Sequence, residues 1–148
     1  MILDVWIPGR PAPQGSKVAM RHSKTGRTIM LESSKALRPW RERIRALAQE
    51  HYTADPLQEA LRVDIVFYFA RPQNHMRTGR YKHELKASAP IFPATKRNDV
   101  DKLSRAILDG LTGVVFDDDG RVVDLRARKV YSTKREGAQV QVRHAVLL

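Results

Sequence analysis

The sequence predicts an α/β fold of the mixed α+β type, in a single small domain with two helices packed on a mixed sheet. Three observations predict it. The length of 148 residues suits one domain. Two segments repeat apolar residues at helical spacing, and four others have the apolar runs or alternation of strands. The expected order is strand–helix–strand–helix–strand–strand over residues 1–148, with basic loops at about 10–30 and 71–98.

The first half of the chain predicts one strand, one helix and a second strand. Residues 2–7 form a short apolar strand that Pro8-Gly9 ends. The Pro- and Gly-containing residues 10–17 predict a turn, and residues 18–28 fit either a hairpin or a loop. Leu37, Trp40, Ile44, Leu47 and His51 recur at helical spacing, which predicts a helix of about 16–18 residues ending near Tyr52. Either Ser33 or Ser34 caps this helix, or Pro39 marks a later first turn. Residues 63–69 alternate as a strand does.

The second half predicts a helix followed by two strands. The helix begins near Asp101, buries Leu103, Ile107 and Leu111, and stops at Gly113. Residues 117–120 (Asp-Asp-Asp-Gly) form a turn. Residues 121–132 and 138–147 alternate apolar and polar side chains, and residues 134–137 between them suit a hairpin turn. We expect Trp40 and Phe67 in the core.

The charge predicts a polyanionic partner. The net charge is +11 and the pI is near 10.4, which favours nucleic acid first and an anionic membrane surface second. Residues 10–45 carry a local +8 and residues 71–98 a local +6. No basic helix has the apolar face of a membrane anchor, and no apolar stretch approaches the roughly 20 residues of a membrane span. The absence of cysteine excludes thiol nucleophiles and Cys-ligated metals. We therefore expect a soluble, cytoplasmic protein without a membrane partner.

The sign of the charge reverses between residues 99 and 119, which hold six aspartates. If the chain is extended up to Asp101 and helical after it, Asp99 and Asp101 share one side at the helix start. Asp119, in the turn after the helix, could bring a third carboxylate. Three hard oxygen ligands suit Mg²⁺ or Mn²⁺, ions that activate water and neutralise the leaving oxygen in phosphodiester hydrolysis. No organic cofactor is indicated.

Simpler explanations exist for each acidic motif. An Asp-x-Asp before a helix often serves as a cap, and Asp-Asp-Asp-Gly is often a solvated turn. An EF-hand is excluded because Leu103 and Gly110 occupy ligand positions. Acids concentrated in a chain that otherwise attracts DNA would repel its phosphates, whereas with a divalent ion they would become a phosphate receptor.

Three motifs together resemble the RusA family of Holliday junction resolvases. They are Asp99-Val-Asp101-Lys102-Leu103-Ser104-Arg105, Asp109-Gly110-Leu111-Thr112-Gly113 and Asp118-Asp119-Gly120-Arg121-Val122-Val123. The resemblance is specific over about residues 96–130 and looser elsewhere. It implies a RusA-like fold and a homodimeric, Mg²⁺-dependent endonuclease that resolves four-way DNA junctions by paired nicks in recombination and repair. It also implies a bacterial or phage-encoded, nucleoid-associated enzyme.

By this resemblance Asp99, Asp101 and Asp119 are the catalytic metal-binding carboxylates, and Asp118 is the other member of the acidic doublet. Arg105 stands where the family has an active-site Lys, and Lys102 where it has an Asn. Arg105 can stabilise developing charge but is a poor proton donor, so Lys102 or a metal-bound water would have to supply a proton. Alternatively, Arg105 forms an ion pair with Asp101 or Asp109.

Five basic residues are candidate DNA contacts: Lys17, Arg21, Lys96, Arg97 and Lys129. Two other functions fit the same sequence. One is a DNA-binding protein without catalysis, whose acids only cap and solubilise. The other is a metal nuclease that cuts flaps or other branched DNA.

Overall fold

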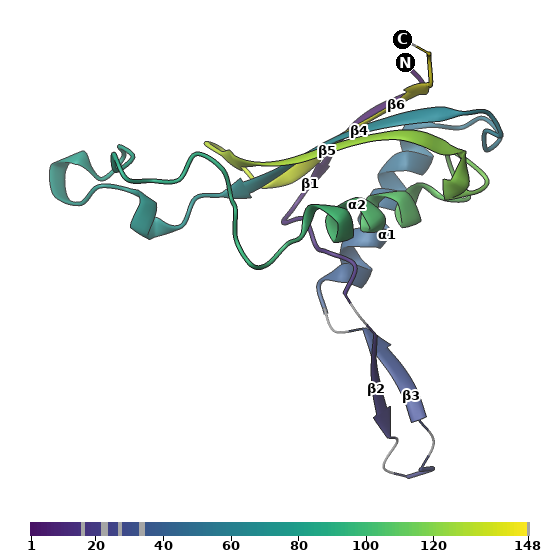
Figure 1. Cartoon of the computed structure of the whole chain (residues 1–148), viewed down its shortest axis with the longest axis horizontal. Helices are drawn as coiled ribbons and strands as arrows, with labels where there is room; N and C mark the ends of the chain where they lie inside the picture. Colours follow the sequence, from purple (N-terminus) through teal and green to yellow (C-terminus); the bar gives the residue numbers. More distant parts are fainter. Residues whose placement is uncertain (16, 22–23, 27, 33–34, 148) are drawn as a thin grey trace.

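Two helices pack on one face of a four-stranded mixed sheet in the computed structural model, as the sequence predicts (Figure 1). The structure describes residues 1–15, 17–21, 24–26, 28–32 and 35–147, with only the backbone of 17–21 and 28–32. The helices are α1 (Leu37–His51) and α2 (Val100–Leu111). The sheet has the order β1-β6-β4-β5, formed by β1 (Leu3–Pro8), β6 (Gly137–His144), β4 (Leu61–Ala70) and β5 (Val122–Ser132).

The strand order corrects one prediction. Residues 121–132 and 138–147 were expected to pair as a hairpin, but β5 runs parallel to β4 while β6 lies between β1 and β4, antiparallel to both. The connection between β5 and β6 passes the end of β4, where the Glu136 carboxylate accepts hydrogen bonds from Ala70 N (3.1 Å) and Arg10 Nη1 (2.9 Å). The physical reason is burial: Ala138, Val140 and Val142 are fully buried in β6, whereas β5 carries charges that suit an edge.

Several element boundaries differ from the predictions by one or two residues. Pro39 lies in the first turn of α1, which confirms the later start; Ser33 and Ser34 lie outside the described residues. α2 begins at Val100 and ends before Gly113, whose φ of 85° stops the helix. The described helices include none that is long and apolar enough to cross a membrane.

Both basic loops have local structure. The first contains an antiparallel hairpin of β2 (Lys17–Arg21) and β3 (Thr28–Glu32), which confirms the hairpin alternative for this segment. The second, residues 71–98, contains two short 3₁₀ turns, η1 (Gln73–His75) and η2 (Gly79–Tyr81), and extends far beyond the end of the sheet (Figure 1).

The core lies between the sheet and the helices. Alternate residues of β4 are buried, and Phe67 (0% exposed) and Trp40 (3%) confirm the predicted core positions. The two helices cross closely at Gly110, where a Cβ atom would lie 2.5 Å from Ile44 Cγ2. Glycine is therefore required at this contact, which holds α2 and its acidic residues in place.

Replacing Gly110 by alanine is expected to destabilise the protein by about 1–3 kcal/mol, because the added methyl group overpacks the helix contact. Urea unfolding would measure the loss. In the double variant Gly110→Ala/Ile44→Ala the side chain that would clash with the added methyl group is gone. The loss in free energy of unfolding should therefore be smaller than the sum of the losses in the two single variants. Additive losses would contradict the contact.

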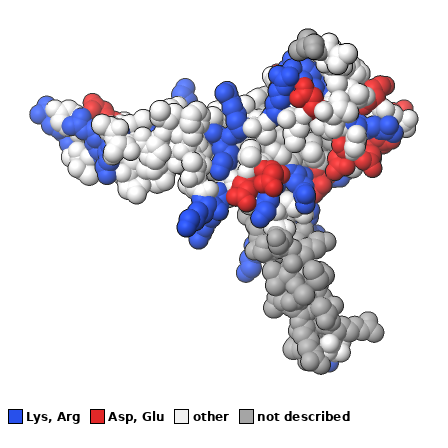
Figure 2. Space-filling view, viewed as in Figure 1, with Lys and Arg blue, Asp and Glu red and all other residues white. Residues whose placement is uncertain are grey.

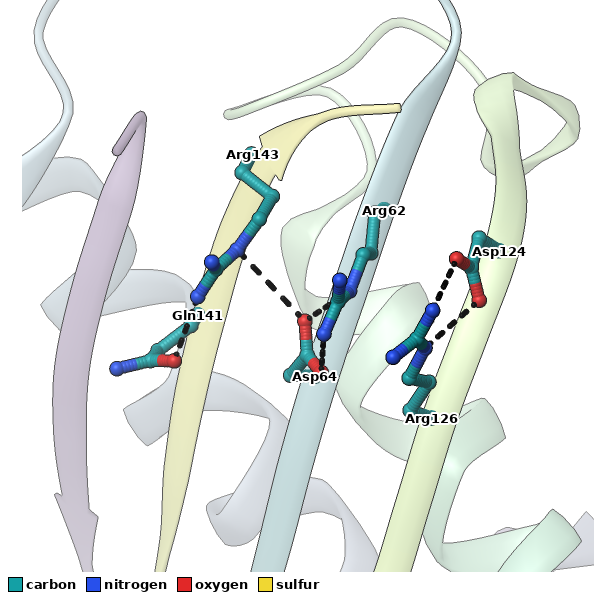
Figure 3. Close-up of polar contacts among 6 residues, drawn as sticks. All are labelled: Arg62, Asp64, Asp124, Arg126, Gln141 and Arg143. Carbon is teal, nitrogen blue, oxygen red and sulfur yellow. Dashed lines mark hydrogen bonds and ion pairs between the residues drawn. The ribbon is translucent and has the colours of Figure 1, made fainter. Parts of the chain in front are cut away.

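The sheet face away from the helices carries paired charges (Figure 3). Arg62 donates two hydrogen bonds of 2.8 Å to the Asp64 carboxylate, and Arg143 lies 3.8 Å from it. The hydrogen bonds from Arg62 lower the pKa of Asp64 below its usual value, although partial burial acts in the opposite direction.

This lowered pKa predicts an acid-sensitive contribution to stability. Because the folded pKa of Asp64 lies below the unfolded value near 3.9, its contribution is fully present above that value and is lost as the pH falls through the folded pKa. Asp64→Asn should cost about 1 kcal/mol at pH 7 and almost nothing near pH 2. Urea titrations at both pH values test this, with exposed Glu50→Gln as a control that should have little effect at either. A loss that does not depend on pH would contradict the assignment.

Candidate active site

A basic groove of about 480 Å³ lies between the Pro-rich turn after β1 and the start of α2. The turn is held there by Gln14 N, which donates a 3.0 Å hydrogen bond to the Lys102 carbonyl. The groove has one acidic side chain, Asp99, among four basic ones: Arg10, Lys96, Arg97 and Lys102. A groove of this charge next to an exposed carboxylate suits a phosphate backbone approaching an acidic site.

The backbone before α2 explains how the acidic residues are presented. Asn98 has a positive φ of 61°, a conformation that asparagine tolerates better than most residues, and it turns the chain into the helix. Asp99 follows in an extended conformation as the N-cap residue, and Asp101 lies in the first helical turn. The Asp99 side chain makes no capping hydrogen bond, so capping does not account for this residue.

The first turn of α2 presents acidic and basic side chains together. The helix buries Leu103, Ile107 and Leu111, which leaves Asp101, Lys102 and Arg105 exposed. Lys102 Nζ lies 3.7 Å from Asp99 Oδ2, a weak exposed ion pair. Arg105 forms no ion pair with a described residue within 4 Å, so the expected alternative of a pair with Asp101 or Asp109 is not present.

The acidic turn after α2 contains three aspartates, and the side chains of two of them form hydrogen bonds within the turn. Asp117 accepts two hydrogen bonds from Arg121, of 2.8 and 3.1 Å, which lower its pKa. Asp118 Oδ1 accepts a 2.7 Å hydrogen bond from Gly120 N and caps the short turn η3 (Asp119–Arg121). Asp119 is exposed, and its side chain has no hydrogen bond or ion pair to the part of the chain that the structure describes. Of the doublet, Asp119 is thus better suited to bind a metal than Asp118.

Asp109 lies near these residues, although the sequence analysis named it only within a motif and as an ion-pair candidate and not as a catalytic or metal-binding residue. It is half-buried on α2, and burial raises its pKa, while Asp119 raises it further and Arg41 and Arg105 oppose the rise. Asp119 therefore lies close enough to Asp109 for their charges to interact. Acidic and basic side chains gather over this part of the molecule (Figure 2). The spacing Asp101, Arg105, Asp109 was the available signal, since residues four apart share a helix face.

The structure does not gather three carboxylates around one point. Across residues 1–15, 24–26 and 35–147, no three His, Asp or Glu side chains lie close enough together to hold one metal ion. The donor set still fits Mg²⁺, which commonly binds through one or two carboxylates and completes its shell with water and substrate phosphates. Exposed hard-oxygen donors of this kind are Asp99 and Asp101 at the start of α2. Asp119, in the turn after α2, is a third.

The five candidate DNA contacts divide into three groups. Lys96 and Arg97 line the groove. Lys129 is half-buried on β5 and lines a small adjoining cavity with Arg10 and Asn98, two residues that also line the groove. Lys17 and Arg21 lie on β2, and their side chains are outside the described part of the structure. Arg10 is the groove residue that the sequence did not single out as a contact; its place in the first basic segment was the only signal.

Comparison with known proteins identifies the family of this chain. The family model described as Endodeoxyribonuclease RusA matches residues 8–143. The chain belongs to the RusA endodeoxyribonuclease family. It is therefore a nuclease that acts on DNA, in a family that uses divalent metal ions. A Bacillus subtilis (strain 168) protein, named "Uncharacterized protein YqaN", is 26% identical over 127 residues, which cover 85% of each chain. The match extends over the groove, α2 and the acidic turn, so the RusA family resemblance in the sequence is confirmed.

Proposed function

We propose that this RusA-family protein resolves Holliday junctions by paired symmetrical nicks, as a homodimer that depends on Mg²⁺. The observation that carries the proposal is the basic groove that ends at Asp99, where α2 presents exposed Asp99 and Asp101. DNA phosphates bound by Lys96 and Arg97 in this groove would be led to the carboxylates.

The residues around the groove divide the chemical work. Asp99 and Asp101 at the helix start, or Asp119 in the turn after the helix, would hold the metal through one or two carboxylates, and the metal supplies water activation and charge neutralisation when bound. Arg105, one helical turn after Asp101, stabilises negative charge on the phosphate but keeps its own proton, because a guanidinium group is a poor proton donor. Lys102, whose Nζ lies 3.7 Å from Asp99 Oδ2, is the side chain that would give a proton to the leaving oxygen.

A homodimer suits a four-way junction because both have two-fold symmetry. Two identical sites would cut two strands within one complex, whereas one site would nick once per binding event. Recognition through phosphates and shape, with a net charge of +11, makes binding strongly dependent on salt.

Cleavage of synthetic four-way junctions, flaps and linear duplexes, each with Mg²⁺ or with EDTA, tests the proposal. We expect symmetrical paired nicks only in the four-way junctions, and only when Mg²⁺ is present. Preferential cutting of flaps would assign a different branched substrate. Binding to junctions without cleavage under any divalent ion would leave a DNA-binding protein without catalysis and overturn the proposal.

A further inference from the structure

Strand β5 forms an open edge of the sheet. Among the strands that the structure describes it pairs with β4 alone, and its other side faces outward (Figure 1). Two of its large apolar side chains are exposed, Val123 by 65% and Leu125 by 45%. An edge strand with exposed apolar residues is a template for pairing with another strand.

An apolar surface continues from this edge toward α2. Leu125 pairs in register with the buried Val63, so Leu125 lies on the side of the sheet that carries the helices, beyond the area that they cover. At the next residue pair along β5, Ala127 lines a groove of about 260 Å³ with Phe92, Pro93 and Val100. Phe92 is 58% exposed, so this groove is an apolar surface that nothing described in the chain covers.

The opposite side of β5 carries an alternation of charge. Asp124 and Arg126 lie in register with Arg62 and Asp64 of β4, on the sheet face away from the helices (Figure 3). Arg126 donates hydrogen bonds of 3.3 and 3.2 Å to Asp124 along the same strand, and both side chains stay partly exposed on this face (53% for Arg126 and 37% for Asp124). The charge pattern decides which second strand fits.

We propose that a second copy of this chain docks here, with its β5 antiparallel to the first and the two-fold axis at Leu125. In this register Asp124 lies opposite Arg126 of the second copy, and the symmetry makes the pair twice. On the helix side Leu125 faces its own copy, and Ala127 lies beside this pair at the apolar groove; Val123 is the extra residue of a β-bulge in β5, so the regular pairing begins at Asp124. Opposite charges on one face and apolar pairs on the other both stabilise the pairing.

The neighbouring symmetric registers are less favourable. A two-fold axis normal to the sheet places one residue of the strand opposite itself. Moving the axis to Asp124 or Arg126 would set two like charges opposite each other, which is destabilising. The sequence of β5 is thus self-complementary in the register centred on Leu125.

This arrangement gives the homodimer of the proposed function a specific interface. The biological meaning of the interface rests on that proposed function. A two-fold axis normal to the sheet keeps all four helices on one side of an eight-stranded sheet. Val100, which lines the apolar groove at this edge, lies between Asp99 and Asp101 in the chain. Both acidic sites therefore face the same side, next to the two-fold axis, where a two-fold symmetric junction can meet both.

A charge exchange tests the register without DNA. Asp124→Arg and Arg126→Asp should each weaken self-association at least about tenfold in sedimentation velocity, because like charges then face each other twice. A mixture of the two variants should recover the dimer as a heterodimer, visible in native mass spectrometry, because each pair is again one acid and one base. Asp4→Arg, on the opposite edge strand β1, is the matched control and should leave association unchanged. A mixture that stays monomeric would overturn the register.

A covalent trap tests the same axis independently of charge. The chain has no cysteine, so Leu125→Cys introduces a single thiol. Directly opposed residues in antiparallel strands have Cα atoms about 4.5–5.5 Å apart, within the range for a disulfide. Mild oxidation should convert Leu125→Cys to a disulfide-linked dimer, while the control Val146→Cys, at a position that is more exposed (68% against 45%), should stay largely unlinked. A wild-type chain that is monomeric at tens of micromolar, or a dimer that Leu125→Cys does not link, would overturn the proposal. Either result is independent of DNA cleavage, so it is distinguishable from a failure of the nuclease assignment.

Discussion

Asp99→Asn and Asp119→Asn are each expected to reduce junction cleavage by at least about a hundredfold while binding to the junction persists or tightens. Stabilisation of the transition state by a bound metal is worth several kcal/mol, and each 1.4 kcal/mol is a factor of ten in rate. Neither side chain has a role that would explain a folding defect: Asp99 makes no capping bond and is exposed, and Asp119 has no partner among the described residues. Removing a negative charge from a surface that attracts DNA should not weaken binding.

Single-turnover cleavage and gel-shift titrations of the same junction would measure the two effects separately. Asp55→Asn is the matched control, since Asp55 is exposed and its backbone carbonyl, which accepts a 2.7 Å hydrogen bond from Tyr52, is unaffected by the change. It should cleave as the wild type does. Unchanged cleavage by either Asp99→Asn or Asp119→Asn would remove that residue from the metal site.

Phe67→Ala is expected to destabilise the fold by about 3–5 kcal/mol, the largest stability effect predicted for this chain. Phe67 is 0% exposed at the centre of β4, between the sheet and both helices, so truncation leaves a cavity that the neighbouring strands cannot fill. A loss of this size is a large fraction of the stability of an ordinary domain.

Urea unfolding monitored by circular dichroism would measure this loss. Ile91→Ala is the control: Ile91 is 76% exposed, so its truncation should change the free energy of unfolding by less than about 0.5 kcal/mol. Equal losses in the two variants would mean that Phe67 does not pack in the core as described.

In the proposed function, the site combines recruitment of DNA and cleavage chemistry on one short stretch of chain. Basic residues just before α2 line a groove, and acidic residues begin where the helix begins. The positive end of the helix dipole favours both the carboxylates and an approaching phosphate. This local arrangement explains how a chain of strongly positive charge can hold its acids where DNA arrives.

Local sequence patterns predicted most of the elements. The alternation in β4 and the helical spacing of Leu103, Ile107 and Leu111 specify which side of each element is buried, because period 2 and period 3.6 distinguish a strand from a helix within a few residues. The acidic motifs likewise predicted a site near the start of α2, which stays a prediction, and the match to the RusA family confirmed the family resemblance.

What the sequence by itself determined is thus the set of elements, their buried faces, the charge of the partner and the position of the acidic residues along the chain. Only the tertiary structure decided that β6 inserts between β1 and β4, that Arg10 reaches the groove, and that Asp109 lies near Asp119. The physical reason is the distance along the chain over which the interactions act. Burial pattern and turn chemistry act over a few neighbouring residues, whereas strand order and the meeting of distant side chains depend on which packing of all elements buries the most apolar surface.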